Sequence, residues 1–151
     1  MVSQKVRNPE RDRLTSTKED VRTERLTDLM KLLSDDKSVL IFNTIVLAGG
    51  GSSETLRTQL EISRKQYYSR ISRLTKAGLV NRQKGRYFVT AFGKVIYDAQ
   101  RLLGSAVKNY WKLKALDSLV ANDKVPKEER SKIIDLMISN PQIKEILLSN
   151  L

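Results

Sequence analysis

The sequence predicts a mainly α-helical protein with one small β-hairpin, and three stretches of the chain support that prediction. Residues 53–90 have the pattern of two short helices joined by a tight turn and followed by two short strands. Residues 91–119 contain no proline and carry apolar residues three and four apart, which is typical of a long helix. Residues 125–151 hold two short amphipathic segments, each with a proline near its start.

The two central helices are delimited by their caps. Ser53 is a candidate N-cap for the first helix. Ser63 is a candidate N-cap for the second, and Gln66 three residues later completes a candidate capping box. Gly78 is placed to end the second helix in the left-handed conformation that other residues resist. These signals predict a second helix over about residues 63–77.

A short hairpin follows that helix. Residues 79–83 and 86–89 are predicted strands, and Lys84-Gly85 between them is a turn signal. Helix, tight turn, helix and hairpin in this order are the layout of a winged helix-turn-helix, with the second helix in the position of the recognition helix and the wing at about residues 79–89.

The second helix has one apolar face and one basic face. Tyr67, Ile71 and Leu74 have the spacing of a buried stripe. The opposite face carries basic, hydroxyl and amide groups, namely Lys65, Gln66, Ser69, Arg73 and Lys76, with Arg70 and Ser72 at its flanks. No acidic residue lies between Arg64 and Lys84. A solvated helix face normally mixes charges of both signs, because like charges one turn apart repel each other. This face therefore favours contact with phosphate oxygens and base edges over the simpler interpretation of two packed helices in a small domain.

The positive charge of the protein is concentrated in the same region. The 151 residues have a formal net charge of +11. Residues 57–101 hold eleven basic and two acidic residues, a net of +9, whereas residues 26–56 have a net of −2. A basic surface confined to one module is the pattern of a protein that binds nucleic acid.

Composition argues against several other functions. The sequence has no cysteine and no histidine, so it lacks thiolate and imidazole metal ligands and the commonest general base. We expect no enzyme activity, no metal and no cofactor. There is no apolar run of membrane length and the N-terminus is polar, so we expect a cytoplasmic protein without a secretory leader or membrane contact. Gly49-Gly50-Gly51 lacks the lysine and the preceding strand of a phosphate-binding loop, and is interpreted as a helix-to-helix connection.

The predicted winged helix-turn-helix domain spans residues 20–90. Residues 1–19, of mixed charge and poor in apolar groups, are expected to form a mobile arm before it. Residues 20–33 are predicted to form the helix that opens the domain, with an apolar stripe of Val21, Leu26, Leu29, Met30 and Leu33. Ser34 is a candidate cap for the next helix, which is apolar nearly all round and is expected to be buried.

Residues 91–119 are predicted to form one long dimerisation helix. Its apolar seam alternates four and three apart and consists of Phe92, Ile96, Ala99, Leu103, Ala106, Tyr110 and Leu113. The seam can pack on the C-terminal segment of the same chain or on a second copy; we favour a homodimer, and both contacts are compatible.

Residues 125–151 are predicted to form a pair of short C-terminal helices. Pro126 stands at a first-turn position of one, and Asn140-Pro141 begins the other with a cap followed by proline. Two helices of this length cannot bury their apolar faces alone, so they are expected to clasp the long helix or that of a partner.

The segment ISRKQYYSRISRLTKAGLVNRQKGRYFVTAFGKVIYDA resembles the winged helix-turn-helix of transcription regulators of the MarR and ArsR type. It is most similar to small archaeal DNA-binding regulators in which a wing ending in YxxT runs into a helix that starts with FGK. The resemblance covers residues 36 to about 104 and does not extend to the C-terminal pair of helices. It implies a DNA-binding transcription regulator whose helix after the wing forms a homodimer.

The resemblance also implies roles for individual residues. Lys65, Gln66, Ser69, Arg70 and Arg73 would face the major groove, and Arg82, Lys84 and Arg86 of the wing would reach the flanking backbone or the minor groove. The full set of candidate DNA-binding residues adds Arg64, Tyr68 and Lys76 from the second helix.

Two other functions are compatible with the residues. A winged helix can serve as a protein-interaction module of a larger complex, with the basic charge serving solubility. It can also bind DNA without sequence preference, as an architectural protein does. The operator, the direction of regulation and any effector ligand are not specified by the sequence.

Overall fold

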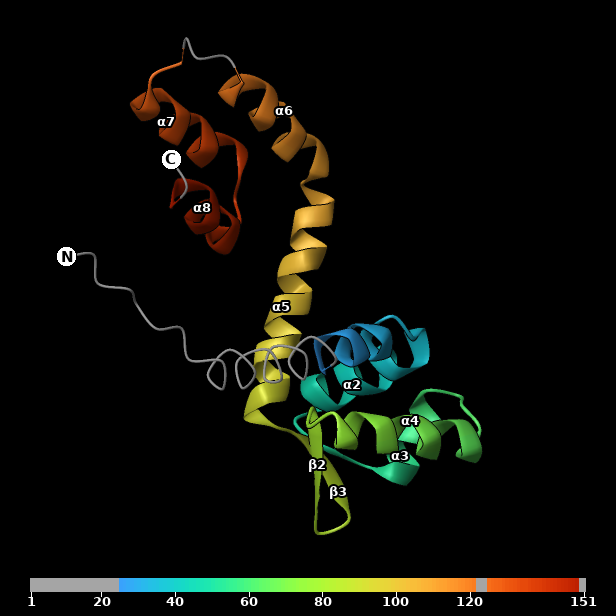
Figure 1. Cartoon of the computed structure of the whole chain (residues 1–151). Coiled ribbons are helices and arrows are strands. Elements are labelled where there is room, and N and C mark those ends of the chain that lie inside the picture. Colours follow the sequence, from blue (N-terminus) through green and yellow to red (C-terminus); the bar gives the residue numbers. More distant parts are fainter. Residues whose placement is uncertain (1–24, 122–124, 150–151) are drawn as a thin grey trace, which may run out of the picture. The chain divides into compact units, whose positions relative to one another are not determined.

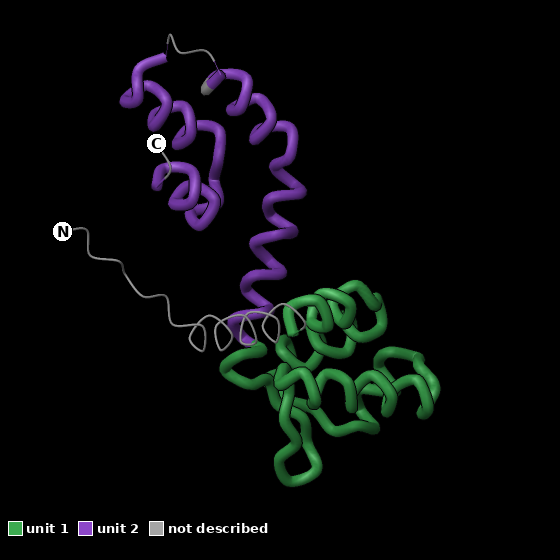
Figure 2. The backbone as a smooth tube through the Cα atoms, in the orientation of Figure 1, with its two compact units in different colours: residues 1–93 green, residues 94–151 purple. Residues whose placement is uncertain are grey.

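The computed structural model describes residues 25–121 and 125–149, and the chain divides into two compact units at Gly93 (Figure 2). The arm predicted for residues 1–19 lies outside the described residues. The predicted fold class, mainly α with a small sheet, is confirmed (Figure 1). Within the described ranges, no helix has the length and apolar character needed to cross a bilayer.

The first unit has the order of elements of a winged helix-turn-helix. Helical residues 25–33 are followed by α2 (Asp36–Ala48), β1 (Gly51–Ser52), α3 (Ser53–Gln59), α4 (Arg64–Lys76), β2 (Val80–Gln83) and β3 (Arg86–Val89). The helix predicted over 63–77 and the wing predicted over 79–89 therefore correspond to α4 and to the β2–β3 hairpin (Figure 1).

The wing belongs to a three-stranded antiparallel sheet in the order β1-β3-β2. Val80 pairs with Val89 across the hairpin, and Gly51 of β1 pairs with Tyr87. Lys84 and Gly85 at the hairpin tip both have positive φ, 47° and 78°, as a type I′ turn requires. The interpretation of the glycine run as a simple connection was incomplete, because its last glycine contributes to β1.

The core of the first unit lies between α2, α3, α4 and the sheet. Its buried side chains include Ile41, Phe42, Ile45, Leu56, Tyr67, Ile71, Leu74, Leu79 and Val80. The stripe predicted on α4 is thus confirmed. One burial prediction was wrong, because α2 buries one face and exposes Leu40 and Leu47. In the helix at residues 25–33, Leu32 is buried, and Leu26 and Met30 of the predicted stripe are exposed. Val21 of that stripe lies outside the described residues.

Three predicted helix starts are displaced by one residue. The cap of α2 is Asp35 rather than Ser34, and the cap of α3 is Ser52 rather than Ser53. Pro126 precedes α7 instead of occupying its first turn. For α2 and α3, the predicted cap and the observed cap are adjacent residues of types that both serve well as caps. The observed caps, Asp35 and Ser52, have an extended backbone and accept a free N–H group of the first turn. The caps Ser63 and Asn140 are confirmed, each accepting from the N–H three residues later.

The second unit begins within α5 (Ala91–Lys108) and continues through α6 (Tyr110–Val120), α7 (Lys127–Met137) and α8 (Pro141–Leu148) (Figure 1). The prediction of one uninterrupted helix over 91–119 was wrong, because the helix breaks at Asn109. Asn109 has φ −98° and ψ 12°, and its side-chain Nδ2 donates to the Ser105 carbonyl at 2.9 Å. A short amide side chain that bonds the preceding turn competes with regular helical hydrogen bonding.

The core of the second unit joins the C-terminal helices to α6 of the same chain. Leu116, Ile134, Ile138 and Ile143 are its buried residues, and Leu102, Leu113, Ile133, Met137 and Leu147 pack around them. The C-terminal helices thus clasp their own chain. Leu113 was predicted to lie in the dimer seam but is part of this intramolecular core.

Candidate nucleic-acid interface

Helix α4 is held by its apolar side against α2 and β2. Ser63 caps its start by accepting from the Gln66 backbone N–H at 3.2 Å. At its end, Gly78 adopts φ 78° as predicted, and the Leu79 N–H donates to the Leu74 carbonyl. Tyr67, Ile71 and Leu74 are buried, so the rotation of α4 is fixed and its other side is turned to solvent.

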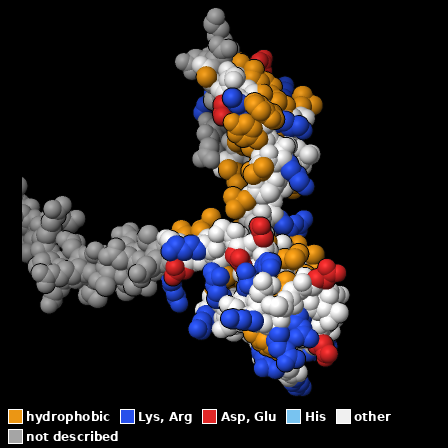
Figure 3. All heavy atoms as spheres, turned by 90° about the vertical axis from the view of Figure 1, so that its right-hand side faces the viewer, with side chains coloured by type: hydrophobic (Ala, Val, Ile, Leu, Met, Phe, Trp, Pro, Cys, Tyr) orange, Lys and Arg blue, Asp and Glu red, His pale blue; other side chains and the backbone are white. Residues whose placement is uncertain are grey.

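The solvent side of α4 is basic and polar. Its exposed residues are Arg64, Lys65, Tyr68, Ser69, Ser72, Arg73, Thr75 and Lys76. Figure 3 shows one face of this unit, on which Lys and Arg side chains gather. Tyr68 stands edge-on to Tyr67, with ring centroids 5.4 Å apart, which keeps an aromatic ring at the margin of the basic surface.

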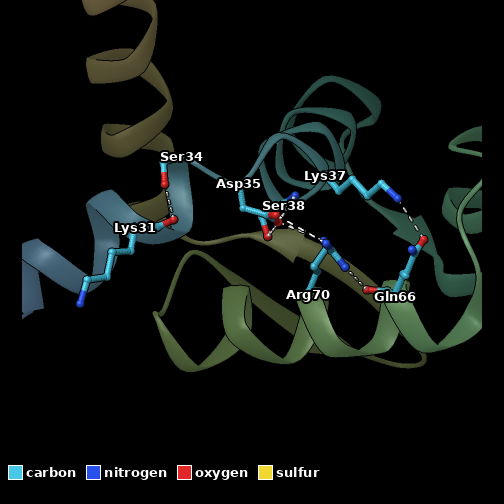
Figure 4. A network of polar contacts seen from close by, with 7 residues as sticks. All are labelled: Lys31, Ser34, Asp35, Lys37, Ser38, Gln66 and Arg70. Carbon is cyan, nitrogen blue, oxygen red and sulfur yellow. Dashed lines mark hydrogen bonds and ion pairs between the residues drawn. The ribbon is translucent and has the colours of Figure 1, made fainter.

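Arg70 is directed into the unit. Its Nε donates to Asp35 Oδ2 at 2.9 Å, its Nη2 lies 3.5 Å from Asp35 Oδ1, and its Nη1 donates to the Gln66 carbonyl (Figure 4). The resemblance to transcription regulators implied that Arg70 faces the major groove. In this structure its guanidinium instead joins α4 to the first turn of α2.

Asp35 is the centre of this contact. Its carboxylate caps α2 by accepting from the Ser38 backbone N–H at 2.9 Å, and it also accepts from the Ser38 hydroxyl. The hydrogen bond from the Ser38 side chain, reinforced by Arg70 against the opposing effect of burial, lowers the pKa of Asp35 below its ordinary value of 3.8. Ser38 lies on α2 and is fully buried, whereas Arg70 lies on α4. Side chains of both helices therefore hold the Asp35 carboxylate.

A second contact joins the same two helices. Lys37 Nζ donates to Gln66 Oε1 at 3.1 Å (Figure 4). Gln66 therefore reaches α2 with its side chain, and only the Ser63 half of the predicted capping box is seen. Lys37 was absent from the predicted site, because nothing in its local sequence indicates that the start of α2 lies beside α4.

The wing presents its own exposed cations. Arg82, Lys84 and Arg86 are exposed, and the Arg82 guanidinium lies 5.9 Å from the ring centroid of Tyr87. This stacking limits the freedom of Arg82. Lys84 lies at the hairpin tip, as one of the two positive-φ residues of the type I′ turn.

Of the predicted DNA-binding residues, nine are exposed on the first unit and two are tied to α2. The exposed ones are Arg64, Lys65, Tyr68, Ser69, Arg73, Lys76, Arg82, Lys84 and Arg86. The two that are tied are Gln66 and Arg70. Within the described part of the chain, acidic side chains do not gather into a group that could hold a metal ion.

Comparison with solved structures gives weak similarities, and BigR and NadR are among the proteins that match. No protein-family model matches the sequence, and no curated protein does so. The transcriptional repressor BigR from Xylella fastidiosa is 20% identical, with a TM-score of 0.43 over 62% of this chain and 93% of BigR. The protein NadR, solved in complex with 4-hydroxyphenylacetate, is 24% identical, with a TM-score of 0.42 over 80% of this chain and 96% of NadR.

Proposed function

We propose that this protein is a transcription regulator that binds double-stranded DNA sequence-specifically as a homodimer. In this proposal α4 enters the major groove and the wing contacts the flanking backbone or the minor groove. The observation that carries the proposal is the solvent face of α4, where exposed cations and hydroxyl groups occur with no acidic residue.

The charge distribution supports a nucleic-acid partner over a protein partner. No acidic residue occurs between Glu61 and Asp98, a range that includes α4 and the whole hairpin. A protein-interaction surface at its centre is usually depleted in charge and rich in apolar and aromatic groups. The exposed face of α4 has the opposite composition, with Tyr68 as its one exposed aromatic residue.

The homodimer is supported by the apolar face of α5. Phe92, Val95, Leu103 and Val107 are at least about half exposed and lie within one 120° arc of an ideal helix, together with Ile96, Ala99 and Ala106. The structure describes every residue of α5, and Gly93 is the one among them that is buried. A contiguous apolar strip of this length is unusual on a monomer and is typical of an interface.

The test is binding to duplex DNA over a series of salt concentrations. We expect the logarithm of the association constant to fall linearly with the logarithm of the salt concentration, with a slope of about one per phosphate contact. Binding should also be stronger for a site selected from a random library than for scrambled DNA of equal length. A protein-interaction module would show little duplex binding near physiological salt, and an architectural binder would show the salt dependence without the preference.

A further inference from the structure

Two side-chain bridges connect the first turn of α2 to α4. Asp35, the cap of α2, pairs with Arg70, and Lys37, two residues into the same turn, donates to Gln66 (Figure 4). Gln66 and Arg70 are one helical turn apart on α4, so the two bridges lie next to each other. The better-buried Asp35–Arg70 pair thus positions the turn from which Lys37 reaches Gln66.

This arrangement fixes which way the Gln66 amide points. A lysine ammonium has three donors and no acceptor, so it can face only the carbonyl oxygen of the amide. With Oε1 accepting from Lys37, the Gln66 NH₂ group remains to donate elsewhere. Lys37 is exposed and retains N–H donors as well. The pair therefore offers several hydrogen-bond donors, while one of the two lone pairs of its carbonyl oxygen is already used and points the oxygen toward Lys37.

Gln66 is well placed to read a base, because it is the third residue of α4. In helix-turn-helix proteins the first residues of the recognition helix contact base edges in the major groove. A glutamine with a free carbonyl reads adenine, accepting from N6 and donating to N7. Guanine presents two acceptors, N7 and O6, in the same groove.

We propose that Lys37 and Gln66 form one reading unit that selects guanine in the major groove. The inference rests on the proposed function and adds a residue of α2 to the recognition surface. Lys37 acts partly as a donor to the base and partly as a positioning residue for the Gln66 amide. Guanine accepts from both side chains, whereas adenine, with its N6 donor facing the two donors, is rejected.

The experiment is selection of binding sites from a random duplex library with the wild-type protein and with Lys37→Met, which keeps most of the side-chain stem and removes the ammonium. The wild type should select guanine at one position of each half-site, by about tenfold over adenine. Lys37→Met should lose that preference or exchange it for adenine, because the freed Gln66 carbonyl can accept from N6. Other positions of the site should keep their preferences.

Two further variants separate a direct role from a general loss of charge. Lys31→Met removes an exposed ammonium from the helix at residues 25–33. This ammonium lies 3.9 Å from Asp28 Oδ1, a loose pairing, and its removal should leave the selected site unchanged. In a Gln66→Ala background, Lys37→Met should no longer shift the preference at that position toward adenine. A merely electrostatic contribution of Lys37 would weaken all sites equally in both backgrounds.

The outcomes distinguish this inference from the proposed function. If the wild type selects a site but Lys37→Met selects the same base at every position, the reading unit is overturned and the regulator proposal stands. If the wild type selects no site, both are overturned. Circular dichroism of each variant confirms that the fold is retained.

Discussion

The Asp35 carboxylate serves three groups at once: the start of α2, the Ser38 hydroxyl and the Arg70 guanidinium. Its lowered pKa has a defined consequence for stability. A carboxyl group whose pKa is lower in the folded than in the unfolded state stabilises the fold above the unfolded value, and this contribution disappears as the pH falls through the folded value.

We expect Asp35→Asn to lower the free energy of unfolding by about 1 kcal/mol at pH 7, because a charge-assisted contact becomes a neutral one while the N-cap is kept. The difference between wild type and variant should shrink below pH 3.8, as the wild-type carboxyl is protonated. Urea unfolding at several pH values measures both. Asp36→Asn, an exposed first-turn change, is the control and should show a smaller difference at pH 7. A difference that is independent of pH would contradict the prediction.

At this scale the sequence predicts which residues are cationic but not what each one contacts. Arg70 was expected to face DNA, and Lys37 was not considered, because their partners lie 35 and 29 positions away. Such contacts depend on how α2 packs on α4, and no periodicity within a single helix contains that information.

Among the elements, α4 and the wing are expected to contribute differently to DNA binding. Arg73→Ala on α4 should cost about 1–3 kcal/mol at the selected site and relax its sequence preference. In the wing, Lys84→Asn removes the charge with a residue that tolerates positive φ, so the turn is preserved. It should weaken selected and scrambled DNA alike and reduce the salt slope by about one. Binding titrations on both DNAs measure the two effects; equal losses of non-specific affinity alone would favour an architectural role.

The start of α5 is held closely against the hairpin. A Cβ on the buried Gly93 would overlap the Leu79 carbonyl oxygen and lie 2.8 Å from Val89 Cγ2. We therefore expect Gly93→Ala to destabilise the first unit by about 1–3 kcal/mol in thermal or urea unfolding.

Gly104 on the same helix provides the matched control, because nothing lies within 4 Å of its added Cβ. Gly104→Ala should raise stability by up to about 1 kcal/mol through helix propensity. Equal effects of the two substitutions would show that the contact at Gly93 relaxes without cost.

The elements were predicted where local chemistry decides them. Ser63 can accept the free N–H groups at a helix start, and Gly78 and Gly85 take positive φ without the strain of a side chain, so these three local predictions are confirmed. The two-residue strand β1 is too short to show an alternating pattern, and its pairing with β3 spans more than thirty residues. The break at Asn109 was missed because asparagine is tolerated within helices as well as at their ends.

For the molecule as a whole, the proposed homodimer predicts which surface joins two copies. We predict that Leu103→Glu, at a leucine that is 59% exposed on α5, converts a dimer to a 17.2 kDa monomer and abolishes tight binding to a two-fold symmetric site. Light scattering and sedimentation at micromolar concentration measure the mass.

Leu136→Glu is the control, because Leu136 is 87% exposed on α7 and lies outside the proposed seam. It makes the same chemical change and should leave both mass and binding unchanged. A wild-type monomer that still binds a symmetric site tightly would show that the α5 face is not a dimer interface.

On the proposed function, the pairing of Arg70 with Asp35 also has a consequence for the time that the protein would spend on DNA. With its guanidinium paired to a carboxylate, Arg70 would make no phosphate contact, so association with an arbitrary sequence would be weaker and would end sooner. A genome offers about a million or more competing sites, and a regulator that lingers on each of them reaches its own site slowly. On the proposed function, a carboxylate that withholds one cation from DNA shortens the search.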